Sequence, residues 1–245
     1  MNISWETKEP MPHAFYLPSA SANPTYDFPN FSDMVSPSVP LVFAFVVVPL
    51  VIIAGETLYN IYLRVCSQSQ TIRKTFLQAL ALILVSFEAS CLTIGFTDLT
   101  KMLVGEQRPN YLQEAIADPN AARLHSVSFP SGHTSTSFNA AVFLFAYILL
   151  LYYRVRLVPT KPSRWWCGEL RSLYLYLALL PVILAGVIGI SRIVDYHHHF
   201  WDVIAGALLG GFFAAATFSA CIISNSEFYG LTGGNFHPGS GAIRT

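Results

Sequence analysis

Five stretches of about 20 predominantly apolar residues constrain this chain most, because a helix of that length crosses the hydrocarbon core of a bilayer. They are Val39–Leu63, Phe76–Thr100, Thr134–Tyr153, Leu173–Ile190 and Val203–Ser224. Only 11% of the residues are charged and 53% are hydrophobic, whereas soluble domains carry about 25% charged residues. Since backbone groups in lipid must bond within their own segment, the sequence predicts an all-α fold, a polytopic transmembrane helical bundle with five spans.

The spans divide the chain into an N-terminal segment (1–38), a transmembrane domain (39–225) and a C-terminal tail (226–245). The connections after the first and third spans and the tail together carry nine basic residues, and the positive-inside rule places this side in the cytosol. These residues are Arg64, Arg73, Lys74, Arg154, Arg156, Lys161, Arg164, Arg171 and Arg244. The N-terminal segment is expected on the opposite side and has no pattern of a cleavable signal peptide, so the first span is expected to direct insertion.

Charge and cysteine content exclude two classes of protein. Basic and acidic residues number 14 each, so nucleic acid is not an expected partner. The four cysteines lie within or beside apolar stretches without paired spacing, and no disulfide framework is expected. Cys66 and Cys167 are candidates for palmitoylation, with an inert thiol as the alternative.

Four further polar residues have mainly structural interpretations. Asn2 and Asn30 begin glycosylation acceptor triplets, but Asn2 is close to the terminus and Asn30 is close to the first span, so neither is expected to be used. Glu56 and Glu88 interrupt the first two spans and are expected to snorkel or to face the bundle interior.

Three polar fragments at the ends of apolar stretches indicate a functional site. They are Lys101–Pro109, Pro130–His133 and Ser191–Asp202, and all three fall on the side opposite the nine basic residues. Charged groups at a membrane end are costly to bury and usually have a function. Together the fragments supply three cations, two spaced histidines and a carboxylate, a set suited to phosphoryl transfer without a metal ion.

Lys101 and Arg108 in the first fragment are suited to bind a tetrahedral oxyanion. They lie seven residues apart, so both would share one helix face if the second span continued past Thr100, as far as Pro109 allows. The alternative interpretation is a pair of interfacial residues that bind lipid headgroups.

The second fragment precedes the third span with Ser131, Gly132 and His133. A helix N-terminus offers unpaired backbone N–H groups to phosphate, and Gly132 allows close approach. His133 would then lie beside the anion. The alternative is an N-cap at Ser131 followed by an interfacial histidine.

The third fragment adds Arg192 and places His198 four residues before Asp202, one turn apart if both lie on a helix. A carboxylate bonded to one ring nitrogen would fix the tautomer and leave the other nitrogen to attack. Interfacial histidines are one alternative. Metal ligation by His197–His199 is another, although consecutive residues on a helix point about 100° apart and cannot all reach one ion.

The combined pattern K-x6-RP, PSGH and SR-x5-H-x3-D resembles the signature of the type 2 phosphatidic acid phosphatase superfamily. Gly55-Glu56-Thr57-Leu58 and Asp195-Tyr196 are similar to its animal lipid phosphate phosphatase branch. The resemblance covers roughly residues 28–225. It differs in two respects: that branch has six spans, of which the first has no counterpart here, and the loop Asn110–Ser128 is shorter and lacks a glycosylation acceptor.

The resemblance implies a role for each matching residue. His198 would be the nucleophile that forms a phosphohistidine, Asp202 would orient it, and His133 would protonate the leaving alkoxide. The phosphate would be bound by Lys101, Arg108, Ser131, Gly132, Ser191 and Arg192.

The expected function is that of a phosphoric monoester hydrolase that acts on phosphatidate, lysophosphatidate, sphingosine 1-phosphate or ceramide 1-phosphate without a metal or other cofactor. Its site would face the exterior or the lumen of the plasma membrane, Golgi or endoplasmic reticulum. A vanadium haloperoxidase shares this pocket but is soluble. A catalytically silent lipid-binding or scaffold relative would be expected to lack His198 or Arg192. The bilayer and a phosphorylated lipid are the expected partners, and glycine and alanine faces such as Gly206–Gly211 would permit a homo-oligomer.

Overall fold

The computed structural model describes residues 27–29, 31–66, 68, 70–117, 127–158 and 166–231, with only the backbone described for 166–172. The described residues form helices and loops without a β-strand. The elements are α1 (Ser38–Val42), the π-helix η4 (Phe43–Val47), α2 (Val48–Val65), α3 (Ile72–Val104), α4 (Tyr111–Ala117), α6 (Gly132–Leu157), α7 (Trp166–Val194) and α8 (Phe200–Ser224).

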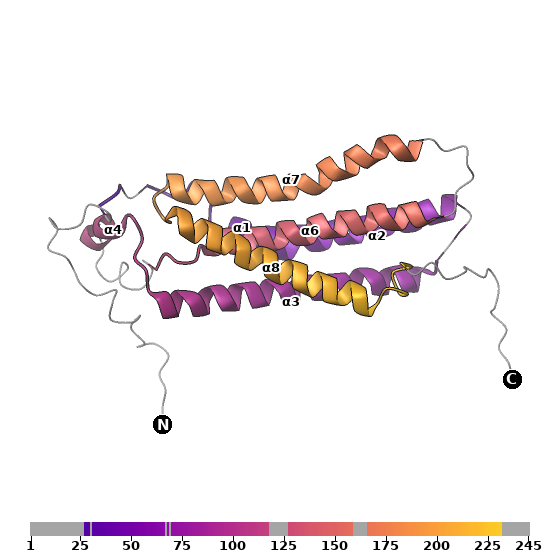
Figure 1. Cartoon of the computed structure of the whole chain (residues 1–245), viewed down its shortest axis with the longest axis horizontal. Coiled ribbons are helices and arrows are strands. Elements are labelled where there is room, and N and C mark those ends of the chain that lie inside the picture. The colour runs from indigo at the N-terminus through magenta and orange to yellow at the C-terminus, as the bar shows by residue number, and fades with distance from the viewer. Residues whose placement is uncertain are drawn as a thin grey trace, which may run out of the picture.

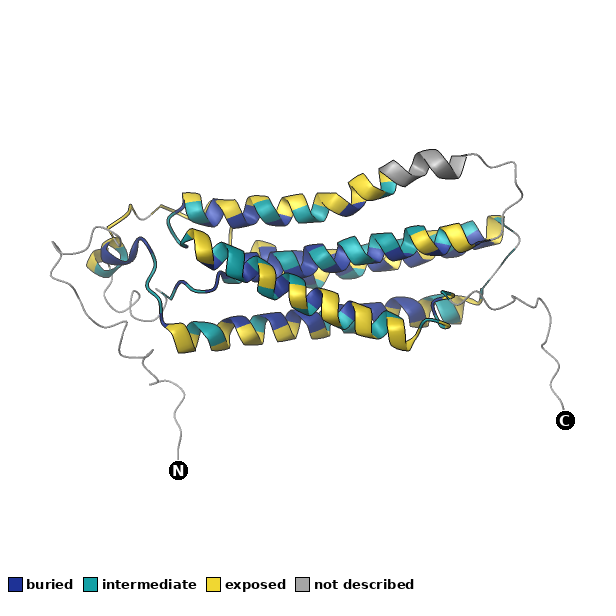
Figure 2. Ribbon diagram, viewed as in Figure 1, coloured by how far each residue is buried: buried dark blue, intermediate teal, exposed yellow. Residues whose placement is uncertain are grey.

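Five helical segments are long and apolar enough to cross a membrane, with α1, η4 and α2 forming one continuous segment over Ser38–Val65. The predicted helical membrane bundle is therefore confirmed. The long helices lie side by side along one axis (Figure 1). Helix α6 contacts all the other long helices, and its buried residues form much of the core, with Phe143 and Tyr147 among them. The outward faces are apolar and exposed, as expected for lipid contact (Figure 2).

The helices extend beyond the predicted apolar stretches. Helix α3 begins after Thr71, whose Oγ1 accepts a hydrogen bond from the N–H of Lys74 (3.3 Å), and α6 ends only at Leu157. Arg64, Lys74 and Arg154 therefore belong to helices, whereas the sequence placed them in connections. Hydropathy underestimates helix length here because the backbone continues past the last apolar side chain.

Glu56 and Glu88 have different environments. Glu56 is buried and faces the bundle interior, where its Oε1 accepts a hydrogen bond from Nη1 of the equally buried Arg154 (2.6 Å). The Arg154 guanidinium also donates to Gln78 Oε1 (3.2 Å) and lies over the Tyr59 ring (4.1 Å). Glu88 is exposed on the bundle surface.

Gly206 and Gly210 bring α8 against α6. A Cβ at Gly206 would lie 2.6 Å from the carbonyl oxygen of Ser131, and one at Gly210 would collide with the carbonyl group of Ser135. These two glycines therefore serve packing within the chain.

Several sequence predictions concern residues outside the described ones. They are the glycosylation acceptors Asn2 and Asn30, the side chain of Cys167, and the basic residues Lys161, Arg164, Arg171 and Arg244.

Candidate active site

The three polar fragments meet at one end of the bundle, which we call the site end. Helices α3 and α7 end there, and α6 and α8 begin there (Figure 1). Thus the first and third fragments lie at the C-termini of α3 and α7. The N-termini of α6 and α8 point toward the same region. Such N-termini carry a partial positive charge and unpaired N–H groups, which favour an anion.

A cavity of about 230 Å³ opens at the site end between α1, α3 and α6. Five of the nine predicted site residues line it: Lys101, Arg108, Gly132, His133 and His198. The rest of the lining includes the apolar side chains of Pro40, Leu41 and Ile94. The cavity thus combines cations and imidazoles with a wall that an apolar chain can contact.

Lys101 and Arg108 reach this cavity by a route that the sequence did not predict. Helix α3 ends at Val104, and Gly105 adopts a left-handed conformation with φ 62°, so the expectation of one continuous helix through both residues is wrong. Glycine is favoured at such a position because it has no Cβ. Lys101 Nζ donates to the carbonyl of Val127 (3.2 Å). Burial lowers the pKa of Arg108, although an arginine remains protonated at neutral pH.

Ser131 is the N-cap of α6. Its Oγ accepts hydrogen bonds from the N–H (3.4 Å) and Oγ1 (2.9 Å) of Thr134, and it is not part of the cavity lining. The alternative interpretation of Ser131 as a cap is therefore confirmed. The next residues, Gly132 and His133, line the cavity, and the buried His133 Nε2 has no hydrogen-bond partner among the described residues.

His198 lies just before α8, with its Nδ1 3.5 Å from Oδ2 of Asp202. The prediction that both residues lie one turn apart on a helix is therefore wrong. His198 precedes α8 and Asp202 lies in its first turn, so the two side chains meet across the start of the helix. Asp202 Oδ2 also accepts hydrogen bonds from the N–H of His199 (2.8 Å) and from Ser128 Oγ, which lies 3.3 Å from His198 Nδ1. This arrangement turns Nδ1 toward the carboxylate while the His198 ring lines the cavity.

Burial dominates the electrostatics of His198. Desolvation lowers its pKa to about 3, with Arg108 and Lys101 adding to the shift and the Asp202 carboxylate opposing it. His198 is therefore neutral at physiological pH, the state in which an imidazole nitrogen has a lone pair.

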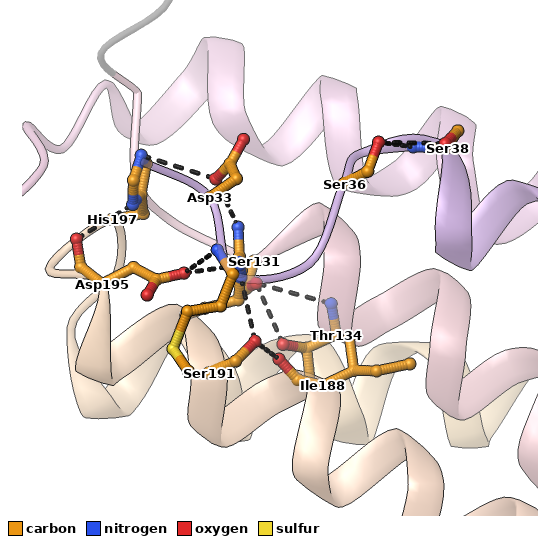
Figure 3. Close-up of polar contacts among 11 residues, drawn as sticks. Asp33, Ser36, Ser38, Ser131, Thr134, Ile188, Ser191, Asp195 and His197 are labelled. Carbon is orange, nitrogen blue, oxygen red and sulfur yellow. Dashed lines mark hydrogen bonds and ion pairs between the residues drawn. The ribbon is translucent and has the colours of Figure 1, made fainter. Parts of the chain in front are cut away.

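Arg192 does not line the cavity and is bound by two carboxylates, those of Asp33 and Asp195, which are labelled in Figure 3. Its Nη1 donates to Asp33 Oδ1 and its Nη2 to Asp195 Oδ2, both at 2.6 Å, and its Nε donates to Ser191 Oγ at 3.3 Å. Ser191 Oγ in turn donates to the carbonyl of Ile188 (2.7 Å). Burial raises the pKa of Asp33, but the bond from Arg192 and the nearby His197 outweigh this, so the net pKa is lowered. In this structure carboxylates therefore bind the two terminal nitrogens of Arg192, the atoms with which it would bind a phosphate.

Residues 31–37 carry Asp33 across the site end. Phe28 and Phe31 stack on Tyr196, with ring centroids 4.8 Å and 5.9 Å away, and the N–H of Met34 donates to Asp195 Oδ2 (3.0 Å). Nothing in the sequence connected this segment with the site, apart from an acidic residue that follows aromatic residues shortly before the first span.

Ser128 was also missed. It precedes the PSGH fragment by two residues, so its proximity to that fragment was the only available signal. Its hydroxyl is fully buried between His198 and Asp202, and this placement identifies it as a residue that positions both.

Two groups of side chains have donor atoms close enough for one metal ion: Asp33, Asp195 and His197, and Glu106, His199 and Asp202. The carboxylates of the first group bind Arg192, and Asp202 in the second accepts hydrogen bonds from Ser128 and His199. His198 belongs to neither group. The three consecutive histidines therefore do not converge on one point.

Comparison with known proteins agrees with this geometry. The family model described as PAP2 superfamily matches residues 76–222, a range that contains all nine predicted site residues. The chain is 32% identical over 133 residues to a PA-phosphatase related-family protein of Dictyostelium discoideum, covering 51% of this chain and 42% of that protein.

Two further relatives are named as phosphatases. Lipid phosphate phosphatase 1 of Arabidopsis thaliana is 32% identical over 145 residues (52% of this chain, 40% of the relative), and phospholipid phosphatase 2 of Homo sapiens is 32% identical over 153 residues (54% and 47%). The matches thus span less than half the length of these relatives. No solved structure matches the chain.

Proposed function

Because the chain belongs to the PAP2 superfamily, we propose that it is an integral membrane phosphatase that hydrolyses the phosphomonoester of a lipid. One observation carries this proposal: His133 and His198 line the same cavity as Lys101, Arg108 and Gly132. A phosphomonoester needs cations around its oxygens, a nucleophile in line with the leaving group and a proton donor for that group. The cavity brings together residues that can fill each of these three roles.

In the first step, His198 Nε2 attacks phosphorus and the bond to the lipid oxygen breaks. The Nδ1 proton of His198 faces Asp202 Oδ2 at 3.5 Å, and this carboxylate stabilises the positive charge that develops on the ring. The negative charge of the bound phosphate favours the protonated form of His133, which takes up a proton when the substrate binds and donates it to the leaving oxygen, so a neutral lipid alcohol departs. The product on the protein is a phosphohistidine at His198.

In the second step, water attacks the phosphohistidine. His133, now neutral, accepts a proton from that water, the P–N bond breaks, and His198 returns to its neutral state with inorganic phosphate released. The protonation states of both histidines are thereby restored for the next turnover.

Lys101, Arg108 and the backbone of Gly132 bind the phosphate oxygens throughout this cycle. They neutralise charge that Mg²⁺ neutralises in other phosphoryl-transfer enzymes, so we propose that catalysis needs no metal. Ser131 and Ser191 support this set through the α6 cap and through Arg192. Arg192 joins the phosphate site when Asp33 leaves it.

The wall of the cavity supports a lipid as the substrate class. Pro40 and Leu41 of α1 and Ile94 of α3 line it, and Leu41 is 46% exposed on the lipid-facing side of the bundle. Phosphatidate, lysophosphatidate, sphingosine 1-phosphate and ceramide 1-phosphate all place a phosphomonoester beside an apolar chain. The basic residues at the opposite end support an orientation in which the site end faces the exterior or the lumen of the plasma membrane, Golgi or endoplasmic reticulum.

Single-turnover labelling tests the two histidine roles. The protein is mixed with a lipid carrying labelled phosphate or with an aryl phosphate, and an acid-labile, base-stable adduct is measured. His198→Ala should form no adduct with either substrate. His133→Ala should lose about 10² to 10⁴ in rate on the lipid but much less on the aryl phosphate, whose leaving group needs no proton.

Two outcomes would contradict the assignment. An adduct that persists in His198→Ala would show that another residue attacks phosphorus. Equal losses on both substrates in His133→Ala would show that this histidine is not the proton donor. A wild-type protein that binds phosphorylated lipid but forms no adduct and releases no phosphate would be a catalytically silent relative.

A further inference from the structure

A second cavity, of about 470 Å³, lies at the end of the bundle opposite the site end. We call it the basal groove. It runs between the last two-thirds of α2 and the first third of α3, next to the connection that joins them. Its lining consists of Ile53, Glu56, Thr57, Asn60, Ile61, Arg64, Ile72, Thr75, Phe76, Ala79, Leu80 and Ile83.

The shape of the basal groove fits one extended acyl chain. Its α2 wall runs from Ile53 to Arg64, a distance of about 16 Å at 1.5 Å per residue. Phe76 (63%) and Leu80 (38%) are exposed to the surrounding lipid, so a chain can enter sideways from the bilayer.

The mouth of the groove carries an anchored cation. Arg64 Nε donates to Asn60 Oδ1 (3.1 Å), and Asn60 is itself fixed by its Nδ2 contact with Thr75 Oγ1 (2.5 Å). This contact holds the Arg64 guanidinium beside Asn60. The two terminal nitrogens of the guanidinium can then bind an anion. A guanidinium held in this way binds two phosphate oxygens at once.

Glu56 provides a hydrogen-bond acceptor deeper in the groove. Its side chain is completely buried, and Oε1 binds Arg154 (2.6 Å) and Tyr147 (3.4 Å). The second oxygen, Oε2, is buried and has no partner among the described residues. Buried carboxylate oxygens are normally bonded, so an unpartnered one in the wall of a cavity indicates a donor supplied by a ligand.

We propose that the basal groove binds an anionic single-chain phospholipid from the leaflet at this end of the bundle. Its phosphate binds Arg64, its backbone hydroxyl donates to Glu56 Oε2, and its chain lies along Ile53, Leu80 and Ile83. The Arg64 guanidinium is bonded to Asn60, which lies one helical turn, about 6 Å, from Glu56, so the phosphate and the neighbouring glycerol hydroxyl of one lipid can reach both groups. A two-chain phospholipid lacks that hydroxyl, and a neutral monoacylglycerol lacks the phosphate.

The proposal is independent of the proposed catalysis, because no groove residue belongs to the candidate active site. The probe is a photoactivatable lysophosphatidylmethanol, an anionic phosphodiester that offers no phosphomonoester to hydrolyse and whose only hydroxyl is on the lipid backbone. It is cross-linked to the purified full chain in lipid nanodiscs, and the labelled peptides are identified by mass spectrometry. Unlabelled lysophosphatidylmethanol, two-chain phosphatidylmethanol and monoacylglycerol serve as competitors, and phosphatidylmethanol has no free hydroxyl.

Matched variants test the two ends of the groove. Leu80→Trp fills it, and Leu84→Trp places the same residue one turn further along α3 at a 59% exposed position outside the lining. Arg64→Gln removes the cation, and Arg73→Gln removes an exposed arginine of α3 that does not line the groove. Melting temperatures of all four variants show that each is folded. Since Arg64 is exposed, Arg64→Gln provides the test even if Leu80→Trp does not fold.

We expect labels in residues 53–64 and 72–83, competition by the single-chain anionic lipid alone, and a loss of roughly tenfold or more in labelling for Arg64→Gln and Leu80→Trp. The two control variants should label as the wild type does. Wild-type labelling of folded Arg64→Gln, or equal competition by the two-chain or the neutral lipid, would overturn the proposal and leave the groove as a surface for ordinary bilayer lipid.

Discussion

Substitution of Gly206 by alanine should impair catalysis although this residue does not line the catalytic cavity. The new Cβ would lie 2.6 Å from Ser131 O, about 0.8 Å short of the 3.4 Å at which ordinary contact begins. The obstacle is backbone at the start of α6, so it cannot rotate away, and α8 must move outward by a similar distance. Because the N–H of Ser131 donates to the carbonyl of Asp202 (3.0 Å), this movement separates Asp202 and His198 from His133.

A displacement of about 1 Å between reacting groups lowers a rate by on the order of 10², and overpacking of this kind destabilises a fold by about 1–3 kcal/mol. We expect kcat for lipid and aryl phosphates to fall to that extent in Gly206→Ala, with a lower melting temperature in detergent. Gly211→Ala is the matched control, because its Cβ would lie 3.6 Å from Val142 Cγ2, an ordinary contact, and both quantities should stay near wild type. Wild-type kcat and melting temperature in Gly206→Ala would refute the idea that close packing of α6 and α8 sets the distance between the two histidines.

Three further predictions follow from the site. Asp33→Asn should strengthen inhibition by inorganic phosphate and lower KM, because a carboxylate no longer competes for Arg192 (2.6 Å); an unchanged inhibition constant would show that phosphate does not displace Asp33. Because the pKa of His198 is lowered from 6.5 to about 3, the native state is stabilised above pH 6.5 relative to acid conditions, and this stabilisation is lost as the pH falls toward 3. The melting temperature of the wild type should therefore fall more steeply over this range than that of His198→Ala, and parallel curves would contradict the neutral state of the buried ring. Activity should persist in excess chelator, and a loss that Mg²⁺ restores would disprove metal-independent catalysis.

The helical part of the fold could be predicted because it depends on hydropathy, a local property of each segment. All five spans were located, and the cations and histidines that line the cavity were identified from three short fragments. Local reasoning failed where a single backbone conformation decided the geometry. Gly105, with φ 62°, ends α3 before Arg108, so the two cations meet through a turn and not along one helix face.

Contacts between residues far apart in the chain could not be predicted from the sequence, for a different reason. Asp33 and Arg192 are 159 residues apart, and nothing in the composition of residues 1–38 marks Asp33 as their point of contact with the site. Arg154 was assigned to a connection because it is basic, but it is buried and bound to Glu56. A charge pattern indicates on which side of the membrane a residue lies and does not identify its partner.

The Glu56–Arg154 pair also has a consequence for how the protein is made. The two residues are 98 positions apart and belong to the first and third spans. A charged side chain in the middle of a span adds about 2.5–3.5 kcal/mol to insertion, and at about 5–20 residues per second the ribosome needs roughly 5–20 s to reach Arg154 after Glu56. During that interval the first span has no partner for its carboxylate, so it should stay with the insertion machinery and enter the lipid together with the third span.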